Sequence, residues 1–478
     1  MLPDRRFNGL SAPSFRDPSG AVFQIDGRIL RVVRPAAEPA LRDFLASLTC
    51  STLLDSRKLT RARDLNREEA RHPALPPSAA DDWVLEHEPV PFPSYPSEWP
   101  PEMLHATALL HLDIAAVALK EGFGLKDASP FNCMFKGAQP IFLDWLSFER
   151  RDPHDATWLA YAQFVRAFVL PLLLHATSGI APAQWFINAR EGIEARDAYR
   201  MLSPLRRLTP VAFKHATLPA WLERKAERQG QTLYRPRRSS SEAQVKFILE
   251  GTFRGLRRAL KAVEPAQRDS RWSDYETSCV SYESAQAEAK EALVRRALAQ
   301  IPPGDVLDIG CNTGNYSAMA AGAGHSVVAI DSDTAAVGRL WTRALQEKLD
   351  ILPLAVSLSN PTPATGWRNG ETLSFLSRAE QRFDCVLFLG VMHHMLVTDR
   401  IPLDEILAML ATLTRSHAIV EFVGPADPMF VKVARGRDRL HRELTLDAFE
   451  DAARTRFDIV NIARIPGMER WVAHLRKR

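Results

Sequence analysis

The stretch that decides the fold is Val306-Leu-Asp-Ile-Gly-Cys-Asn-Thr-Gly-Asn315, an apolar run that leads into two glycines. The apolar half is typical of a buried strand, and the glycines predict a tight turn into a helix. Asp331 directly follows the next apolar run, residues 326–330, so we expect an acid at the end of a second strand. Ends of parallel strands meet at one edge of a sheet, where ligands bind. We therefore expect a ligand pocket at this edge.

Helix and strand patterns alternate around this stretch. Such alternation predicts an α/β domain with a doubly wound, mainly parallel, Rossmann-like sheet. The strands that we expect are residues 305–309, 326–330, 383–389 and 417–423, and the helices are residues 287–300, 316–323, 334–347 and 403–413.

Two ligand classes compete for the loop that contains Gly310 and Gly314, both of which allow tight turns and close approach. A dinucleotide site prefers G-x-G-x-x-G, with backbone amides facing a pyrophosphate. Here Asn312 stands at the middle position and Asp308 precedes the loop. An acid suits a cationic ammonium group better than a pyrophosphate, and Asp331 can accept hydrogen bonds from both hydroxyls of a ribose. A purely structural turn is the remaining alternative.

The order D-x-G-x-N-x-G followed by a strand-end acid resembles the class I S-adenosylmethionine-dependent methyltransferases. The resemblance implies that Asp308 and the loop from Gly310 to Gly314 hold the methionine portion of the cofactor, and that Asp331 holds its ribose. An acid after the third strand often meets the adenine in these enzymes, but Ser357 stands there in this chain. Aromatic residues before the first helix of the domain can either cover the cofactor or simply pack: Trp272, Tyr275 and Tyr282.

Methyl transfer from a sulfonium requires that the nucleophile and the methyl group are aligned and that water is excluded. A base is needed only when the acceptor oxygen or nitrogen is protonated. His393 and His394 follow an apolar strand at the mouth of the expected pocket and are candidate bases. Capping or packing is the alternative for both. Glu421, at the end of a later strand, is a third catalytic candidate, with a structural hydrogen-bonding role as its alternative. No metal site is expected in this domain.

The chain before this domain divides into two regions. Residues 1–100 predict an α+β lobe with a hairpin that turns at Asp26 and Gly27. Residues 101–265 are mainly helical, with helices expected at 103–121, 156–175 and 241–263. The methyltransferase domain is expected to occupy residues 266–478.

A second signature lies in the helical region, where Asp127 and Asn132 are followed by Asp144 after an apolar run. The pattern resembles the catalytic loop and metal-binding Asp of kinase-like phosphotransferases. The resemblance implies one base and two oxygen ligands for Mg²⁺, and hence a Mg-ATP site. The stretch from Asp17 to Gly20 is a weak substitute for a phosphate loop, and Arg31 stands where a phosphate-binding Lys is expected. A substrate-binding or scaffold domain is the alternative.

Six further segments resemble a family of two-part bacterial proteins, namely uncharacterised methyltransferases related to a host-specificity nodulation protein. The resemblance implies methyl transfer to an O or N nucleophile of a small molecule or glycan. The alternatives are a bifunctional kinase and methyltransferase acting on a shared acceptor, and a non-catalytic cofactor-binding or scaffold protein. The segments are Phe15-Arg-Asp-Pro-Ser-Gly-Ala-Val-Phe23, Ser94-Tyr-Pro-Ser-Glu-Trp99, Leu125-Lys-Asp-Ala-Ser129, Leu143-Asp-Trp-Leu-Ser-Phe-Glu149, Asn360-Pro-Thr-Pro363 and Gly366-Trp-Arg368.

The composition limits the classes of binding partner and the cellular compartment that we expect. A formal charge of +4, from 61 basic and 57 acidic residues, gives no field typical of nucleic-acid binding. The Arg-rich stretch at residues 233–241 is expected to be a solvated linker. The cysteines form no CxxC pair, which predicts a reducing, cytoplasmic setting without a zinc site. No secretion signal or membrane span is expected. The oligomeric state does not follow from the sequence.

Overall fold

The computed structural model describes residues 16–66, 68–70, 75, 82–229, 238–266, 284–436, 441 and 443–478. The chain forms two compact units. Unit 1 contains Met1–Lys136, Pro140–Ala266 and Ala364–Leu373, and unit 2 contains Gly137–Gln139, Gln267–Pro363 and Ser374–Arg478. Several residues named above lie outside the described residues: Phe15, Trp272, Tyr275, Tyr282 and residues 233–237.

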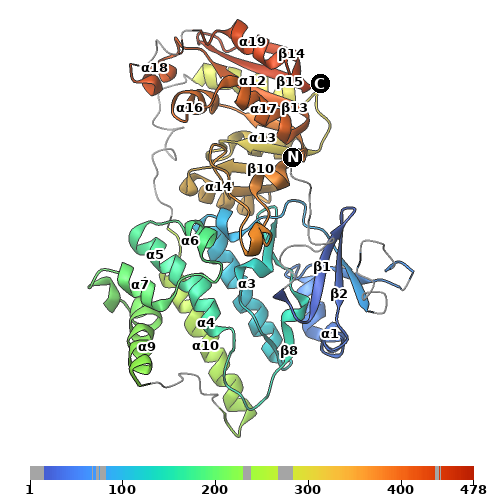
Figure 1. The fold of residues 1–478 in the computed structure, drawn as a ribbon, viewed down its shortest axis with the longest axis vertical. Helices are drawn as coiled ribbons and strands as arrows, with labels where there is room; N and C mark the ends of the chain where they lie inside the picture. Colours follow the sequence, from blue (N-terminus) through green and yellow to red (C-terminus); the bar gives the residue numbers. More distant parts are fainter. Residues whose placement is uncertain are drawn as a thin grey trace. The chain divides into compact units, whose positions relative to one another are not determined.

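Unit 1 begins with a four-stranded antiparallel sheet in the order β1-β2-β4-β3, and helices dominate the rest of it (Figure 1). Its strands are β1 (Gly20–Ile25), β2 (Arg28–Val33), β3 (Ala62–Asp64), β4 (Trp83–His87), β5 (Phe123–Leu125), β6 (Cys133–Lys136), β7 (Gln139–Phe142) and β8 (Phe148–Arg150). Its helices are α1 (Glu38–Leu45), α2 (Leu48–Asp55), α3 (Pro101–Lys120), α4 (Tyr161–Phe164), α5 (Leu170–Ser178), α6 (Ala183–Asn188), α7 (Ala195–Met201), α8 (Pro210–Ala212), α9 (Leu218–Gln229) and α10 (Glu242–Ala262).

The hairpin expected at Asp26 and Gly27 is confirmed, since β1 and β2 pair directly across these two residues. Their φ angles are 49° and 77°, which is the left-handed backbone that a two-residue hairpin turn requires. One face of the sheet buries a small apolar cluster that includes Phe23, Leu30 and Val84. The hairpin thus closes a core that belongs to the sheet itself.

The central element of the helical part is α3, a helix of 20 residues. By length and composition it could cross a membrane, and it alone passes that test among the described residues. However, 67% of its apolar window is buried inside the structure, which is typical of the core helix of a folded domain. Helix α3 therefore serves as the scaffold on which β5 and α10 pack.

The helix expected at residues 156–175 begins later than the sequence pattern indicates. Its first turn is α4, and residues Val165–Val169 form a π-helical turn before α5 continues to Ser178. Thr157 and the residues around it precede the helix, because the Asp155 carboxylate accepts a hydrogen bond from the Thr157 amide at 2.8 Å. A local side-chain turn of this kind competes with helix formation.

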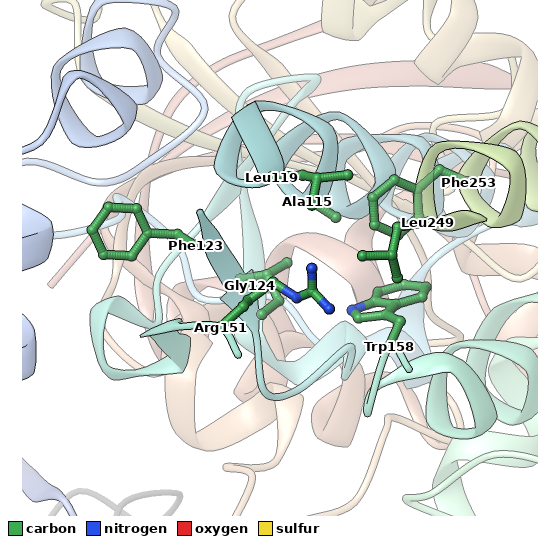
Figure 2. Close-up of a pocket in the computed structure, with 9 residues that line it drawn as sticks. Ala115, Leu119, Phe123, Gly124, Arg151, Trp158, Leu249 and Phe253 are labelled. Carbon is green, nitrogen blue, oxygen red and sulfur yellow. The ribbon is translucent and has the colours of Figure 1, made fainter. Parts of the chain in front are cut away.

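A small cavity of about 10 Å³ lies between α3, β5 and α10. It is lined mainly by apolar side chains, and Figure 2 shows the Arg151 guanidinium beside the Trp158 indole at its wall. A space of this size holds no more than one water molecule. It is therefore a packing gap and not a ligand site.

Unit 2 is built on a seven-stranded sheet in the order β11-β10-β9-β12-β13-β15-β14, and helices flank it (Figure 1). All neighbours are parallel except β15, which pairs antiparallel with β13 and β14. Its strands are β9 (Asp305–Ile309), β10 (Ser326–Asp331), β11 (Ile351–Ala355), β12 (Phe383–Phe388), β13 (Thr414–Val423), β14 (Phe457–Arg464) and β15 (Arg470–Lys477). Its helices are α12 (Ser284–Leu298), α13 (Asn315–Gly322), α14 (Thr334–Glu347), α15 (Phe375–Ala379), α16 (Met392–Val397), α17 (Leu403–Leu413), α18 (Pro428–Ala434) and α19 (Leu446–Arg454).

This sheet confirms the predicted doubly wound α/β domain. The strand order reverses at β9 and β12, so the carboxyl ends of these two strands open the crevice in which such sheets bind ligands. The predicted strand at 305–309 and the helices at 334–347 and 403–413 have the observed bounds. The final hairpin, β14–β15, was not predicted, because its strands mix polar and apolar residues without strict alternation.

Each unit also takes one short segment from the sequence range of the other. Within unit 1, Arg16 is ion-paired with the buried Glu371, and the Leu373 amide donates to the Tyr95 hydroxyl at 3.5 Å. Within unit 2, the Trp341 indole donates to the Ala138 carbonyl at 3.0 Å. The division into units is therefore not a single cut of the chain.

Two glycine-to-alanine substitutions in unit 1 are expected to change stability in opposite directions. At Gly27 a Cβ meets no atom within 4 Å, so the left-handed backbone is the one source of strain. Gly27→Ala should therefore lower the free energy of unfolding by about 1 kcal/mol. At Gly251, inside α10, the backbone is helical and the nearest atom is 3.9 Å away, so Gly251→Ala should stabilise by about 0.5–1 kcal/mol. Free energies of unfolding in urea measure both. Equal signs for the two variants would contradict this account.

Candidate functional site

The loop between β9 and α13 is a backbone cradle that tolerates only glycine at two positions. Gly310 has φ 72°, and a Cβ there would lie 2.2 Å from a Val391 γ-methyl. Gly314 has φ 83°, and its Cβ would lie 2.2 Å from a Leu340 δ-methyl. The amide of Gly310 donates to the Ile330 carbonyl at 2.8 Å, which joins the loop to β10. Both glycines are therefore required by packing and by backbone conformation.

Asp331 ends β10 beside this loop. Its carboxylate accepts a hydrogen bond from the Asn312 amide at 2.9 Å and another, at its second oxygen, from the Asp333 amide at 2.8 Å. Burial raises its pKa, while these amides lower it. Each carboxylate oxygen has two lone pairs, so one acceptor position per oxygen remains after the backbone contacts. The carboxylate is thus fixed in orientation and can still accept a pair of hydroxyls.

Asp308 lies beneath the cradle and is only 2% exposed. Its carboxylate accepts a hydrogen bond from the Ser317 hydroxyl of α13 at 2.6 Å. Burial raises its pKa to about 6, Ser317 and Lys290 lower it, and Asp331 raises it. The charged form of a buried carboxylate is unfavourable unless a cation lies close to it.

These groups fit the cofactor that the sequence predicts. The two glycines allow the left-handed turns of the loop, Asp331 offers an oriented carboxylate, and Asp308 offers negative charge that burial makes unfavourable without a cation. An adenosyl ribose and a methionine ammonium group are ligands of this chemistry. The loop amides would lie along the methionine portion, with Asp331 at the ribose.

The adenine end is less fully defined by side chains. Ser357 follows β11, as the sequence suggests, and its hydroxyl lies 3.0 Å from that of Ser359. The stretch turns back at once, because the Asn360 amide donates to the Ser357 carbonyl at 3.3 Å. Ser357 therefore stays a predicted cofactor contact. Tyr282, the other such prediction, lies outside the described residues.

The two candidate histidines lie in the first turns of α16. His393 is 1% exposed, and neither of its ring nitrogens has a hydrogen-bond partner among the described residues. Burial lowers its pKa to about 3, with further lowering by His394. His394 is half-buried, and its ring centre lies 4.2 Å from that of His393. His393 is therefore an uncharged imidazole, and both residues stay predictions as catalytic groups.

Glu421 is fully buried at the end of β13, where it belongs to a charge network that the sequence analysis missed. One carboxylate oxygen lies 2.7 Å from Lys290 Nζ of α12, and the other lies 3.5 Å from the Arg470 guanidinium of β15. Arg470 also makes two hydrogen bonds to Asp427, at 2.8 and 3.0 Å. The only signal of this network in the sequence was Lys290, which stands where the helical spacing predicts an apolar residue. This catalytic candidate is thus ion-paired from two sides.

In unit 1 the structure brings the kinase-like residues to one place. Asp127 is exposed, and partial desolvation together with the nearby Asp144 carboxylate raises its pKa. Asn132 donates to the Ser147 hydroxyl at 3.5 Å, and this hydroxyl in turn donates to Asp144 at 2.5 Å. Arg31 of β2 lies 3.3 Å from Asp144. The predicted base, amide and second acid therefore share one neighbourhood.

The same contacts occupy the groups that a metal would need. Asp144 already accepts hydrogen bonds from Ser147 and from the Leu146 amide, and it is ion-paired with Arg31. No group of three or more metal-ligating side chains is found among the described residues. Gly20, the last residue of the weak phosphate loop, is instead the first residue of β1, where its Cβ would meet the Val32 carbonyl at 2.6 Å.

The sheet order, the glycine cradle and the strand-end acid define a class I S-adenosylmethionine-dependent methyltransferase domain. A family model described as a methyltransferase domain matches residues 282–465. Nodulation protein NoeA of Rhizobium meliloti (strain 1021) is 31% identical over 469 residues, which cover 97% of this chain and 95% of the relative. The chain belongs to the NoeA family, as the sequence resemblance predicted.

Two solved structures that match part of the chain are described as methyltransferases. The N-methyltransferase NodS from Bradyrhizobium japonicum WM9 is 14% identical and matches 41% of this chain and 98% of its own, with a TM-score of 0.31. The bifunctional kinase-methyltransferase WbdD is 21% identical and matches 44% of this chain and 40% of its own, with a TM-score of 0.27.

Asp308 gives the stability of the protein a specific pH dependence. Its folded-state pKa is above the ordinary value, so its stabilising contribution is complete below about pH 4 and is lost as pH rises through about 6. Asp308→Asn removes this dependence. The variant should therefore gain about 1.4 kcal/mol relative to the parent between pH 5 and pH 7.5.

Urea unfolding at the two pH values measures the difference. Asp447→Asn, at an exposed position of α19, is the matched control. A difference between Asp308→Asn and the parent that does not change with pH would show that this carboxylate titrates in its ordinary range.

Proposed function

We propose that the protein transfers a methyl group from S-adenosylmethionine to an O or N nucleophile of a small molecule or glycan. The observation that carries the proposal is the cradle itself, in which Gly310 and Gly314 admit no side chain and Asp331 is held by two backbone amides. When bound, the cofactor supplies an activated methyl group. The protein therefore has to align the methyl group with the nucleophile and to exclude water.

Each part of the cradle has a distinct task in this proposal. The loop and Asp331 orient the cofactor along the edge of the sheet, since the loop is hydrogen-bonded to β10 and Asp331 is held by the Asn312 and Asp333 amides. Asp308 supplies the negative charge that favours an ammonium group. The buried ends of β9 and β12 exclude water from the reacting atoms.

Proton handling is a smaller part of the proposal. His393 is uncharged and buried, with open hydrogen-bonding capacity, so it suits a neutral acceptor of a hydrogen bond from the nucleophile. His394 is the more accessible of the two and suits proton exchange with solvent. Glu421 is engaged by Lys290 and Arg470, and it suits a role in the electrostatics of the pocket.

The acceptor class is supported by the balance of charges and by the relative. A net charge of +4 offers no strong field for a nucleic-acid acceptor. The NoeA relative is a nodulation protein, which agrees with small-molecule or glycan chemistry. We also place the protein in the cytoplasm, since Cys50, Cys133, Cys311 and Cys385 are free thiols.

Two glycine variants test the cradle. Gly310→Ala should weaken S-adenosylhomocysteine binding by about tenfold or more, because the loop must shift to relieve the contact with Val391. Gly322→Ala is the matched control, since its Cβ meets no atom within 4 Å at the end of α13. Calorimetric titration of the full chain measures both affinities.

Labelled methyl transfer then tests the acceptor class. Label should enter small-molecule or oligosaccharide fractions with the parent protein and not with Gly310→Ala. Absence of cofactor binding by the parent, or equal binding by both glycine variants, would contradict the proposal. Label in nucleic acid or protein would contradict the acceptor class, and cofactor binding without transfer to any fraction would favour the non-catalytic alternative.

A second candidate function is phosphoryl transfer to the same acceptor by unit 1. It is favoured by one observation, the convergence of Asp127, Asn132 and Asp144. It is opposed by Arg31, whose guanidinium already neutralises Asp144. The alternative for unit 1 is an acceptor-binding or scaffold role.

Titration with Mg·ATP distinguishes these roles. Phosphotransfer requires binding by the parent and loss of binding in Asp144→Ala, because Asp144 is the predicted metal ligand. Asp43→Ala is the matched control, since this carboxylate pairs with Arg150 at the surface. A parent protein that does not bind Mg·ATP would exclude the second candidate.

A further inference from the structure

Helices α7 and α9 of unit 1, together with the turns between them, expose a concentrated set of large apolar side chains. We call this surface the α7–α9 patch; its two helices are drawn in green and pack against each other (Figure 1). Its exposed apolar residues are Met201, Leu205, Leu208, Phe213, Leu218, Trp221 and Leu222. Fifteen large apolar residues are exposed among the described residues, and these seven lie within 22 positions of sequence. A large exposed apolar surface marks a site of interaction with a protein or a membrane.

The apolar side chains share one side of α9 and continue onto the turn before it. Leu218, Trp221 and Leu222 are three and four positions apart, so they lie on one side of the helix. The Phe213 ring meets the Trp221 ring edge to face, with 6.1 Å between the ring centres. The 3₁₀ turn Arg206–Leu208 packs against the helical turn that starts at Phe213. The exposed apolar residues therefore form one connected surface.

The α7–α9 patch is also basic. Residues 198–222 contain four Lys or Arg and no Asp or Glu. The guanidinium groups of Arg207 and Arg224 lie 4.1 and 5.8 Å from the centre of the Tyr199 ring. These two residues and Arg206 form no ion pair with a described residue. The surface thus combines exposed apolar side chains with cations that no carboxylate of the described chain compensates.

We infer that the α7–α9 patch binds the surface of a membrane that contains anionic lipids. In this arrangement the cations lie at the lipid phosphates, and the apolar side chains enter the boundary between headgroups and acyl chains. The inference concerns attachment to the membrane surface and not a membrane span. It does not rest on the proposed function.

Shape and charge favour a lipid surface over another protein. Leu205 and Leu208 are 83% and 67% exposed, so they project from the chain and line no groove. A protein partner needs a pocket that complements each projecting side chain, whereas a fluid acyl layer accepts them without one. A second copy of this chain, seated patch to patch, would bring like charges together, which opposes association. An anionic lipid surface complements both the apolar and the basic part.

Flotation of the full chain with lipid vesicles tests the inference. The parent should bind vesicles of phosphatidylcholine mixed with phosphatidylglycerol more tightly than vesicles of phosphatidylcholine alone. Binding to the mixed vesicles should weaken in about 1 M salt, because the Debye length is then only about 3 Å.

Two double variants separate the apolar from the electrostatic contribution. Leu205→Ser/Leu208→Ser should weaken binding to the mixed vesicles about tenfold or more, because two large apolar side chains no longer enter the lipid. Arg206→Gln/Arg224→Gln should weaken it about thirtyfold at low salt, because each cation near an anionic surface contributes about fivefold to the affinity. The arginine variant should lose most of its salt dependence as well.

The matched control is Leu48→Ser/Leu159→Ser, which removes two leucines that are 76% and 56% exposed outside the patch. It should bind the mixed vesicles like the parent. All of the substituted side chains are exposed, so urea unfolding should give each variant the parent's free energy of unfolding.

Three results would overturn the inference. The first is a parent that does not bind the mixed vesicles, and the second is equal binding to both kinds of vesicle. The third is self-association of the parent that Leu205→Ser/Leu208→Ser abolishes, without vesicle binding by either protein. This last result would assign the patch to contacts between copies of the chain.

Discussion

The hydrogen bond from the Asn312 amide to Asp331 is the interaction on which the pocket depends. It joins the loop after β9 to the end of β10, so the cradle and the acidic group keep a fixed separation. Asn312 has φ 49°, a left-handed conformation that Asn adopts more readily than most non-glycine residues. Hydrogen bonds therefore join the loop, the end of β10 and the residue that caps α14.

Much of unit 2 followed from the sequence because its signals are local. Buried parallel strands are continuous apolar runs, and the loop from Gly310 to Gly314 allows few backbone conformations. The terminal hairpin did not follow, since an edge strand with mixed polarity resembles a loop. Lys290 and Arg470 did not follow either, because each meets Glu421 through a contact distant in the sequence.

The buried charges show how this pocket balances opposing requirements. Asp308 alone is unfavourable in the folded chain, whereas Glu421 is compensated by cations from two other elements. In the proposed function, the carboxylate that faces the cationic ligand has no ion-pair partner as close as those of Glu421.

The exchange of short segments has a consequence for synthesis of the chain. Unit 1 includes Ala364–Leu373, so it is incomplete when the ribosome has released only its first 266 residues. The buried Glu371, which pairs with Arg16, is made more than three hundred residues after its partner. Unit 1 therefore cannot finish folding before β9, β10 and β11 of the methyltransferase sheet have been made. The two halves of the protein mature together, and fragments cut at residue 266 would each lack a piece of their own structure.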